Sequence, residues 1–390
     1  MGIHVISMCA ILAIIPLYWL PDLPDLHLVW LLIAAGIALS VQQRKWLRFS
    51  GLALLFMCWG ILAAQESVWP MNHLTKAPQQ AEVVITATDG ATMHQGRIVS
   101  LNGKRVWAAM GVALYGNYLP QNVCVGQRWA MTLRLRAVHG ELNDGGYDSQ
   151  KNAFARHQTL SGRFTHAALV DEGCSLRAQY LTSLQNTLSA YQWGPVILGL
   201  GMGERLSVSR EIKNLMRETG TMHLMAISGL HIALAASVIW FLTRGIQFFL
   251  PGRWIIWQIP LLAGLIFAAF YAWLTGLQPP ALRTVIALVV LAALKMSGRQ
   301  WSPWQVWLTC VAAILIFDPL AVLSQSLALS AFAVAALIFW YQWLPLPHWQ
   351  RGRRLRPMVT LLYLQVGMLL LLLPLQVLIF HGFSLSSLVA

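Results

Sequence analysis

Long apolar runs separated by short polar connections make up both ends of this chain. Each run is about 15 to 22 residues long, and a helix rising about 1.5 Å per residue needs roughly that length to cross a hydrocarbon layer of about 30 Å. The pattern predicts nine membrane-spanning helices, at residues 3–20, 26–41, 50–65, 225–243, 254–274, 281–297, 303–317, 326–343 and 358–379. The first run lacks a small-residue cleavage site, so we expect a retained helix rather than a signal peptide.

Between residues 66 and 222 the pattern changes, and apolar and polar positions alternate with a period of two. EVVITATDG, GRIVSLNGKRVWAAMGVALYG, QRWAMTLRLRAV and GRFTHAALVD show this alternation and are bounded by turn residues, as short strands are. About five such strands favour a small β-barrel, of the oligonucleotide/oligosaccharide-binding (OB) type. Helical periodicity returns after them, and Ser209 is a candidate cap for an amphipathic helix.

These patterns divide the chain into four parts. We predict three transmembrane helices at 1–65, an OB-like β domain at 66–180, amphipathic helices at 181–222 and a helical transmembrane domain at 223–390. The predicted fold class is therefore a polytopic α-helical membrane protein with a small, inserted, exported β-barrel. Composition agrees, because 57% of the residues are hydrophobic and only 11% are charged, whereas soluble globular domains are about a quarter charged.

The positions of the cations predict how the chain is oriented. Short loops rich in Lys and Arg stay cytoplasmic, and every second connection carries such residues: Arg44, Lys45, Arg48, Arg244, Lys295 and Arg299. This places the N-terminus inside the cell and residues 66–222 outside. That exported segment holds 15 Lys and Arg against 11 Asp and Glu, a net charge of +4, so the spans are almost free of charge.

Two of the five cysteines, Cys124 and Cys174, lie in the exported segment. Its compartment would be oxidising, which favours a disulfide between them; two free thiols are the alternative. The remaining three, Cys9, Cys58 and Cys310, fall in predicted spans and fit small packing residues.

Sequence motifs for catalysis or cofactor binding are weak. There is no HExxH, no CxxC and no phosphate-binding loop, so we predict no metal site, no cofactor and no enzymatic activity. Ser228, His231 and Asp318 could form a nucleophilic triad, but Ser228 lacks the glycine-flanked elbow of known hydrolases.

Three segments resemble the ComEC family of DNA-internalisation competence proteins. They are ILGLGMGERLSVSREIKNLMRETGTMHLMAISGLHIAL, WLTGLQPPALRTVIALVVLAALKMSGRQWSPW and DPLAVLSQSLALSAFAVAAL. In addition, residues 142–164 resemble the linker that closes the family's exported OB-like domain. Together the resemblance covers nearly the whole chain.

The resemblance implies a channel in the bacterial inner membrane that takes up single-stranded DNA during natural transformation. Its implied partners are single-stranded DNA, the lipid bilayer, a DNA receptor and a cytoplasmic motor; the oligomeric state stays open. The ligand set of the family's C-terminal metallo-β-lactamase-like domain is absent from this sequence, so nuclease activity is not implied. The chain also stops where the family's competence domain continues, and we expect it to be a fragment.

A strand bearing phosphate charges needs a hydrated path walled by protein. The candidate lining consists of polar residues inside predicted spans or next to their ends, with one glycine among them: Thr221, His223, Ser228, Gly229, His231, Gln278 and Arg283. The spacing of Thr221, Ser228 and His231 predicts one helical face, and Gly229 would allow close helix packing. We expect Arg283 to contact a phosphate or to bridge to Asp318.

Structural explanations for these residues remain open. The polar face also fits interhelical hydrogen bonding, and Arg283 fits a structural ion pair. In the exported domain, base stacking and phosphate contact are predicted for Arg105, Trp107, Arg128, Trp129, Arg134 and Arg136, with an ordinary strand surface as the alternative. The competing function is a membrane-embedded enzyme or transporter for a lipid or cell-envelope precursor, with Ser228, His231 and Arg283 in its pocket.

Overall fold

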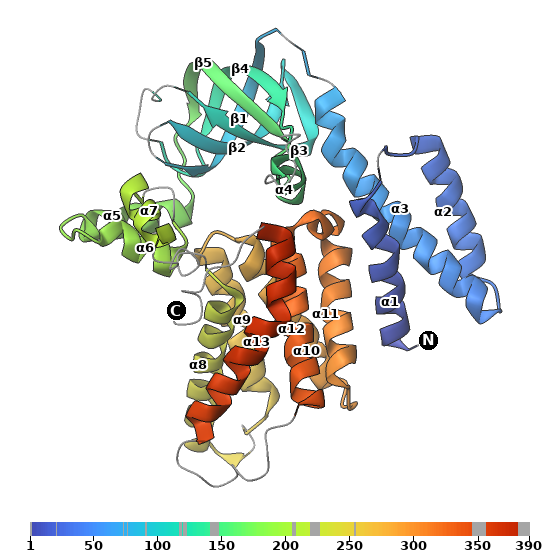
Figure 1. Ribbon diagram of the computed structural model, residues 1–390. Helices are drawn as coiled ribbons and strands as arrows, with labels where there is room; N and C mark the ends of the chain where they lie inside the picture. The colour runs from blue at the N-terminus through green and yellow to red at the C-terminus, as the bar shows by residue number, and fades with distance from the viewer. Residues whose placement is uncertain are drawn as a thin grey trace.

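The computed structural model describes residues 2–380 except 21, 73, 76, 90–91, 117–118, 120–122, 141–147, 205–207, 219–226, 253–254 and 345–355. It has two parts, a small barrel and an assembly of apolar helices (Figure 1). In the view of Figure 1 the barrel stands above the helices, and helix α3 (Lys45–Asn72) runs from one to the other. The chain therefore reaches the barrel directly from a helix of membrane-spanning length.

Each of the nine predicted spans coincides with a helix. They are α1 (Ile3–Ile14, extended by η1, Ile15–Tyr18), α2 (Leu26–Ser40), α3, α8 (Gly229–Phe248), α9 (Gln258–Leu274), α10 (Pro279–Met296), α11 (Pro303–Phe317), α12 (Gln325–Trp343) and α13 (Arg356–Phe380). A further short turn, η4 (Pro319–Leu323), separates α11 from α12. Among the described residues, α3, α8, α10 and α12 are long and apolar enough to cross a membrane.

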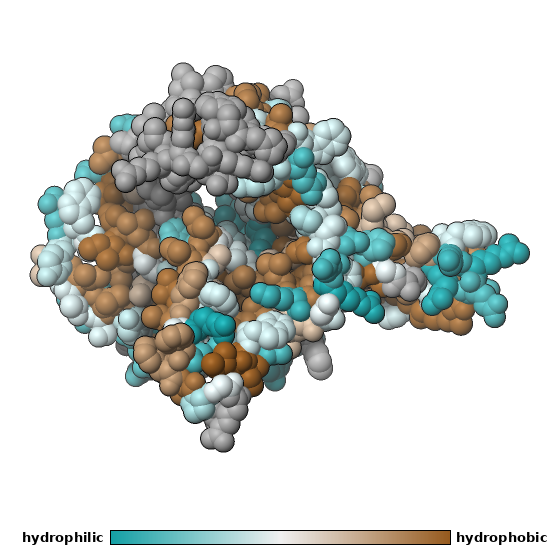
Figure 2. All heavy atoms as spheres, turned by 90° about the horizontal axis from the view of Figure 1, so that it is seen from below, coloured by the Kyte–Doolittle hydropathy of each residue, from teal (hydrophilic) through white to brown (hydrophobic). Residues whose placement is uncertain are grey.

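The outer surface of this helical assembly is apolar. Leu234, Phe241 and Ile266 are 61%, 67% and 69% exposed, and brown hydrophobic residues cover much of the body in Figure 2. Such a continuous apolar surface is too large for a water-soluble monomer. The chain is a membrane protein in composition and surface.

Five strands form the closed barrel: β1 (Gln79–Thr88), β2 (Met93–Leu101), β3 (Lys104–Tyr115), β4 (Arg128–Ala137) and β5 (Leu160–Asp171). Their order is β1-β2-β3-β5-β4, with β3 and β5 parallel and the other pairs antiparallel. The Asn102-Gly103 turn joins β2 to β3 with positive φ angles of 50° and 75°, the geometry that favours these two residues in a tight hairpin. The prediction of a small β-barrel is confirmed.

Alternate residues of each strand fill the barrel. Val83, Val112, Trp129 and Leu133 are fully buried in its core. Trp129 also donates its indole N–H to Gln127 Oε1 at 3.2 Å. The period-two alternation thus puts the apolar side chains inside and leaves the arginines of β4 outside.

Three short helices connect the barrel to α8: α5 (Leu176–Leu188), α6 (Gly194–Met202) and α7 (Arg210–Glu218). Ser209 accepts a hydrogen bond from the backbone N–H of Ile212 at 3.3 Å, as expected for the cap of α7. Arg177 on α5 donates to Leu274 O at 2.7 Å and to Met202 O at 3.3 Å, the last residues of α9 and α6. Burial lowers the pKa of this guanidinium, and nearby Glu204 opposes that shift.

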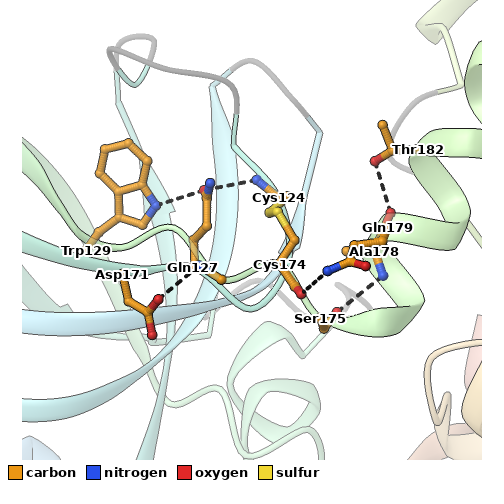
Figure 3. Close-up of a disulfide and its surroundings, with 10 residues drawn as sticks. Cys124, Gln127, Trp129, Asp171, Cys174, Ser175, Ala178, Gln179 and Thr182 are labelled. Atoms are coloured by element: carbon orange, nitrogen blue, oxygen red, sulfur yellow. Dashed lines mark hydrogen bonds between the residues drawn. A yellow bond between two sulfur atoms is a disulfide. The ribbon is translucent and has the colours of Figure 1, made fainter.

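A disulfide joins Cys124 to Cys174, between the loop before β4 and the loop before α5 (Figure 3). Gln127 lies beside it, and its side-chain oxygen accepts the backbone N–H of Cys124 at 3.1 Å. On the other side, Gln179 of α5 donates to Cys174 O at 3.0 Å. The bridge therefore fastens the start of α5 to one end of the barrel.

We expect loss of this bridge to destabilise the barrel. The two cysteines are 50 residues apart, and closing a loop of that size stabilises a fold by about 4 kcal/mol in the chain-entropy model. The substitution Cys174→Ser should lower the denaturant midpoint of the barrel, followed by amide hydrogen exchange in strands β1 to β5 at increasing denaturant concentration. Cys310→Ser, at a free cysteine of α11, serves as the control and should leave the barrel transition unchanged.

Helices α2 and α3 cross at a pair of glycines. A Cβ atom at Gly51 would lie 2.6 Å from both Gly36 O and Ser40 N. Only the absence of a side chain allows this approach, which is typical of helix packing in membranes. In contrast, a Cβ atom at Gly245 of α8 would meet nothing within 4 Å.

The substitution Gly51→Val should therefore force α2 and α3 apart. Overpacking of this kind costs about 1 to 3 kcal/mol, and thermal unfolding of the detergent-solubilised protein should show a lower midpoint. Gly245→Val introduces the same side chain into open space, and its midpoint should stay close to that of the wild type. Equal midpoints for both variants would contradict the close crossing.

Candidate functional site

Three helices of the apolar assembly begin at the end that faces the barrel. The N-caps of α8, α10 and α12 are Ser228, Gln278 and Ser324, and all three helices start at the upper end of the assembly in Figure 1. Helix N-termini carry unpaired N–H groups and a partial positive charge, which favour anions. We call this region the barrel-facing end.

Ser228 and His231 form a close pair at the start of α8. Ser228 Oγ lies 2.9 Å from His231 Nδ1, and the backbone N–H of Ser228 donates to the same nitrogen at 3.2 Å. Because Nδ1 accepts the backbone N–H, a neutral ring carries its proton on Nε2. The pair caps the helix and leaves the Nε2–H of His231 as the ring's donor.

The prediction of one helical face from Thr221 to His231 is wrong in part. Ser228 has extended backbone angles, φ −87° and ψ 162°, and α8 begins only at Gly229. Ser228 and His231 are therefore neighbours as a cap and a first-turn residue, since a capping side chain folds back over that turn. Thr221 and His223 lie outside the described residues.

Gly229 brings α8 against α10. A Cβ atom at Gly229 would collide with Thr284 Oγ1, so the predicted close approach at this glycine is present. Thr284 donates its hydroxyl to Pro280 O at 3.0 Å. Gln278, half-buried, precedes α10 without capping it through its side chain.

Arg283, the residue before Thr284, extends from α10 to the start of α12. It donates to Ser326 Oγ at 2.8 Å and to Ser324 Oγ at 3.4 Å. The predicted bridge to Asp318 is replaced by these serine contacts, because Asp318 Oδ1 lies 3.2 Å from His157 Nε2. The direct partners of the guanidinium are thus uncharged hydroxyl groups, and Asp318 acts on it only through longer-range electrostatic attraction.

The same contact argues against the triad. A Ser-His-Asp triad needs an acid on the imidazole nitrogen away from the serine, and Asp318 is bonded to His157 instead of His231. In the described part of the chain, no group of three His, Cys, Asp or Glu side chains is arranged to hold a metal ion.

His157 connects the barrel to the helices through the turn after α4 (Ser149–Ala155). Its φ of +53° is the left-handed conformation, and its carbonyl oxygen lies so close to Gly111 of β3 that a Cβ atom there would collide with it. The hydrogen bond to Asp318 raises the pKa of His157 against the opposing effect of burial. Lys151 of α4 adds a second contact, 4.4 Å above the ring of Tyr18.

A cavity of about 360 Å³ lies beside this turn, between α3 and the barrel. Glu66, Arg97, Arg156 and His157 supply its charged groups. Ser228, His231 and Arg283 are not among its lining residues. The polar pair of α8 therefore belongs to a separate place in the molecule.

The structure corrects one prediction for the exported domain. Trp129 is fully buried in the barrel core, so it cannot stack on a base. Its position in the alternating pattern of β4 puts it inside, next to outward-facing Arg128. Arg105, Arg134 and Arg136 are exposed like Arg128, whereas the side chain of Trp107 lies outside the described residues.

Comparison with known proteins gives the family. The barrel and apolar helices define a membrane protein with an inserted β domain, and residues 200–390 match the family described as "Competence protein". The chain belongs to the ComEC-type competence proteins. No solved structure matches it.

Three relatives show the extent of the similarity. "Uncharacterized protein YcaI" of Escherichia coli is 58% identical over 390 residues, covering 100% of this chain and 52% of that protein. "Recombination protein 2" of Haemophilus influenzae is 32% identical over 361 residues, 91% of this chain and 44% of its own length. "Competence protein ComA" of Neisseria gonorrhoeae is 32% identical over 292 residues, 71% and 41% respectively. The chain thus spans about half the length of these relatives or less.

The contact between His157 and Asp318 should make barrel docking depend on pH. The folded-state pKa of His157 lies above 6.5, so its contribution to stability is complete below pH 6.5 and is lost as pH rises through the raised pKa. We expect the thermal midpoint of the wild type to fall over that interval. His157→Gln keeps a hydrogen-bond donor without titrating and should flatten this part of the profile, as should Asp318→Asn; an unchanged slope in both variants would refute the assignment.

Proposed function

We propose that this chain forms part of the path by which single-stranded DNA crosses the bacterial inner membrane during natural transformation. The match to the competence family supports a role in competence, and the name "Competence protein ComA" is that of a relative. The observation that carries the proposal is the barrel-facing end, where uncharged hydrogen-bonding groups, three helix N-termini and Arg283 gather next to the barrel.

The chemistry of this end suits weak, repeated contact with a strand. Ser228, His231 and Gln278 offer hydrogen bonds without a fixed charge, and conduction requires contacts that release as readily as they form. Arg283 is the exception. Placed where the strand enters, it would attract phosphates toward the helix N-termini.

The positions of the cations support an exported barrel. The α2–α3 turn with Arg44 and Lys45 and the α10–α11 turn with Arg299 lie at the ends of their helices away from the barrel (Figure 1). Figure 2, viewed from below, shows hydrophilic residues at the protruding α2–α3 turn. Under the positive-inside rule this end is cytoplasmic, and the barrel faces the periplasm.

Uptake by living cells tests the proposal. In a deletion strain complemented with the full-length gene, His231→Leu and Arg283→Gln should each lower transformation frequency at least about tenfold, the effect of losing one charged or critical hydrogen bond of about 1.4 kcal/mol or more. Ser228→Ala should act in the same direction. Ser237→Ala is the matched control, because Ser237 lies on the exposed side of α8 and its hydroxyl donates to Ala233 O of the same helix at 2.8 Å.

Two results would count against the proposal. If both His231→Leu and Arg283→Gln gave the wild-type transformation frequency at normal protein levels in the membrane, the barrel-facing end would not be part of the path. Covalent labelling of Ser228 by a serine-directed probe would favour the competing function, an enzyme acting on a lipid or cell-envelope precursor. The 2.9 Å contact between Ser228 Oγ and His231 Nδ1 is the feature that supports such an enzyme.

A further inference from the structure

Two arginines stand directly opposite one another on the outside of the barrel. In the antiparallel pairing of β4 and β5, Arg134 is the register partner of Arg163, and both side chains are exposed. Like charges in directly opposed positions destabilise a sheet. Within the described part of the chain, neither guanidinium has a hydrogen bond or an ion pair that offsets this repulsion.

An aromatic ring continues the row onto the next strand. β5 pairs in parallel with β3, and Arg163 is the register partner of Tyr115, which is 44% exposed. Arg136, also exposed, follows Arg134 by two residues and so lies on the same face of β4. Tyr115, Arg163, Arg134 and Arg136 form one outward-facing group, which we call the arginine row.

Acidic residues lie at the opposite end of these strands. Arg128, at the start of β4, is the register partner of Asp171. Glu82 of β1 pairs with Ala130, four residues before Arg134. An acidic residue is therefore the register partner of the arginine at one end of β4, whereas an arginine is the partner at the other end.

We propose that the arginine row is a binding site for single-stranded nucleic acid, with a phosphate between Arg134 and Arg163 and a base stacked on Tyr115. A phosphate there accepts hydrogen bonds from both guanidinium groups and removes their mutual repulsion. An exposed ring next to this phosphate gives a base a stacking surface, the combination that strand-binding proteins use. The outer face of β3, β5 and β4 differs from the β2–β3 face and adjoining loops that OB-type barrels commonly use.

This inference rests on the proposed function, since a barrel on the uptake path would meet the strand before the helices do. The row weakens the barrel when empty and strengthens it when a strand is bound. Arginines with a purely structural role would instead stabilise the barrel when no strand is bound.

Binding by the purified full chain tests the site directly. The probe is fluorescein-labelled poly(dT), and fluorescence anisotropy is measured over a series of salt concentrations with the protein in neutral detergent. The double variant Arg134→Gln/Arg163→Gln should bind about tenfold more weakly or worse at low salt. The slope of log affinity against log salt should become shallower by about 0.7 for each phosphate that the variant no longer neutralises.

Two further variants separate this site from a general loss of positive charge. Lys104→Gln removes an exposed positive charge at the β2–β3 hairpin, at the end of β3 away from Tyr115, and should leave affinity and salt slope near those of the wild type. Tyr115→Ser should weaken poly(dT) binding while leaving the salt slope unchanged, because stacking releases no counterions. The thermal midpoint of Arg134→Gln should equal or exceed that of the wild type without DNA, since a repulsion has been removed.

Each outcome decides between explanations. Equal affinity for poly(dT) in the wild type and the double variant would overturn the arginine row, even if the helix variants still abolish uptake. No binding of poly(dT) by the wild type would overturn it as well. Binding to phosphatidylglycerol vesicles that is lost in the double variant, with poly(dT) binding intact, would identify the row as a lipid-headgroup contact instead. A different result would separate the two proposals. If His231→Leu and Arg283→Gln took up DNA normally while the double variant bound poly(dT) more weakly, the path through the helices would be refuted and the arginine row would be supported.

Discussion

Hydrocarbon does not solvate charge or unpaired backbone groups, and this constraint shapes the whole molecule. It confines the spanning segments to helices, whose backbone hydrogen bonds are internal, and it puts the charged residues into the barrel, the turns and the helix ends. Arg283 illustrates the rule, since it extends from α10 to the hydroxyl groups at the start of α12. The same constraint would require polar groups throughout for any phosphate that crossed such an assembly.

The junction between barrel and helices depends on a few contacts of different kinds. The turn after α4 presses its backbone against β3 at Gly111 and extends His157 to Asp318. Lys151 covers the ring of Tyr18 on the neighbouring turn η1. Because these groups are polar and partly exposed, they fix the orientation of the barrel without the apolar burial that would make the junction permanent.

Sequence periodicity predicts the helices and the barrel because both signals are local. The alternation along β4 also predicts that Trp129 points inward with Met131 and Leu133. A tryptophan suggests base stacking by its residue type, but its position in the strand determines that it is buried. The apolar run continues through Ser228 and so predicts a helical residue there. In the structure Ser228 is the N-cap of α8, and its backbone N–H donates to the side chain of His231. The contact of His157 with Asp318 spans 161 residues of sequence, and the pairing of Arg134 with Arg163 depends on strand register. Neither can be deduced from spacing along one segment.

The disulfide has a mechanical consequence. Cys174 precedes α5, and Arg177, within the first turn of that helix, is bonded to the last residue of α9. The barrel is thereby tethered twice, through α3 on one side and through the start of α5 on the other (Figure 1). A body held at one point can swivel freely, whereas a body held at two can only rock about the line between them. The four residues between β5 and α5 already make the second attachment, and the disulfide removes slack from it by fixing Cys174 to the loop before β4. The redox state of the two thiols therefore sets how far the barrel can rock.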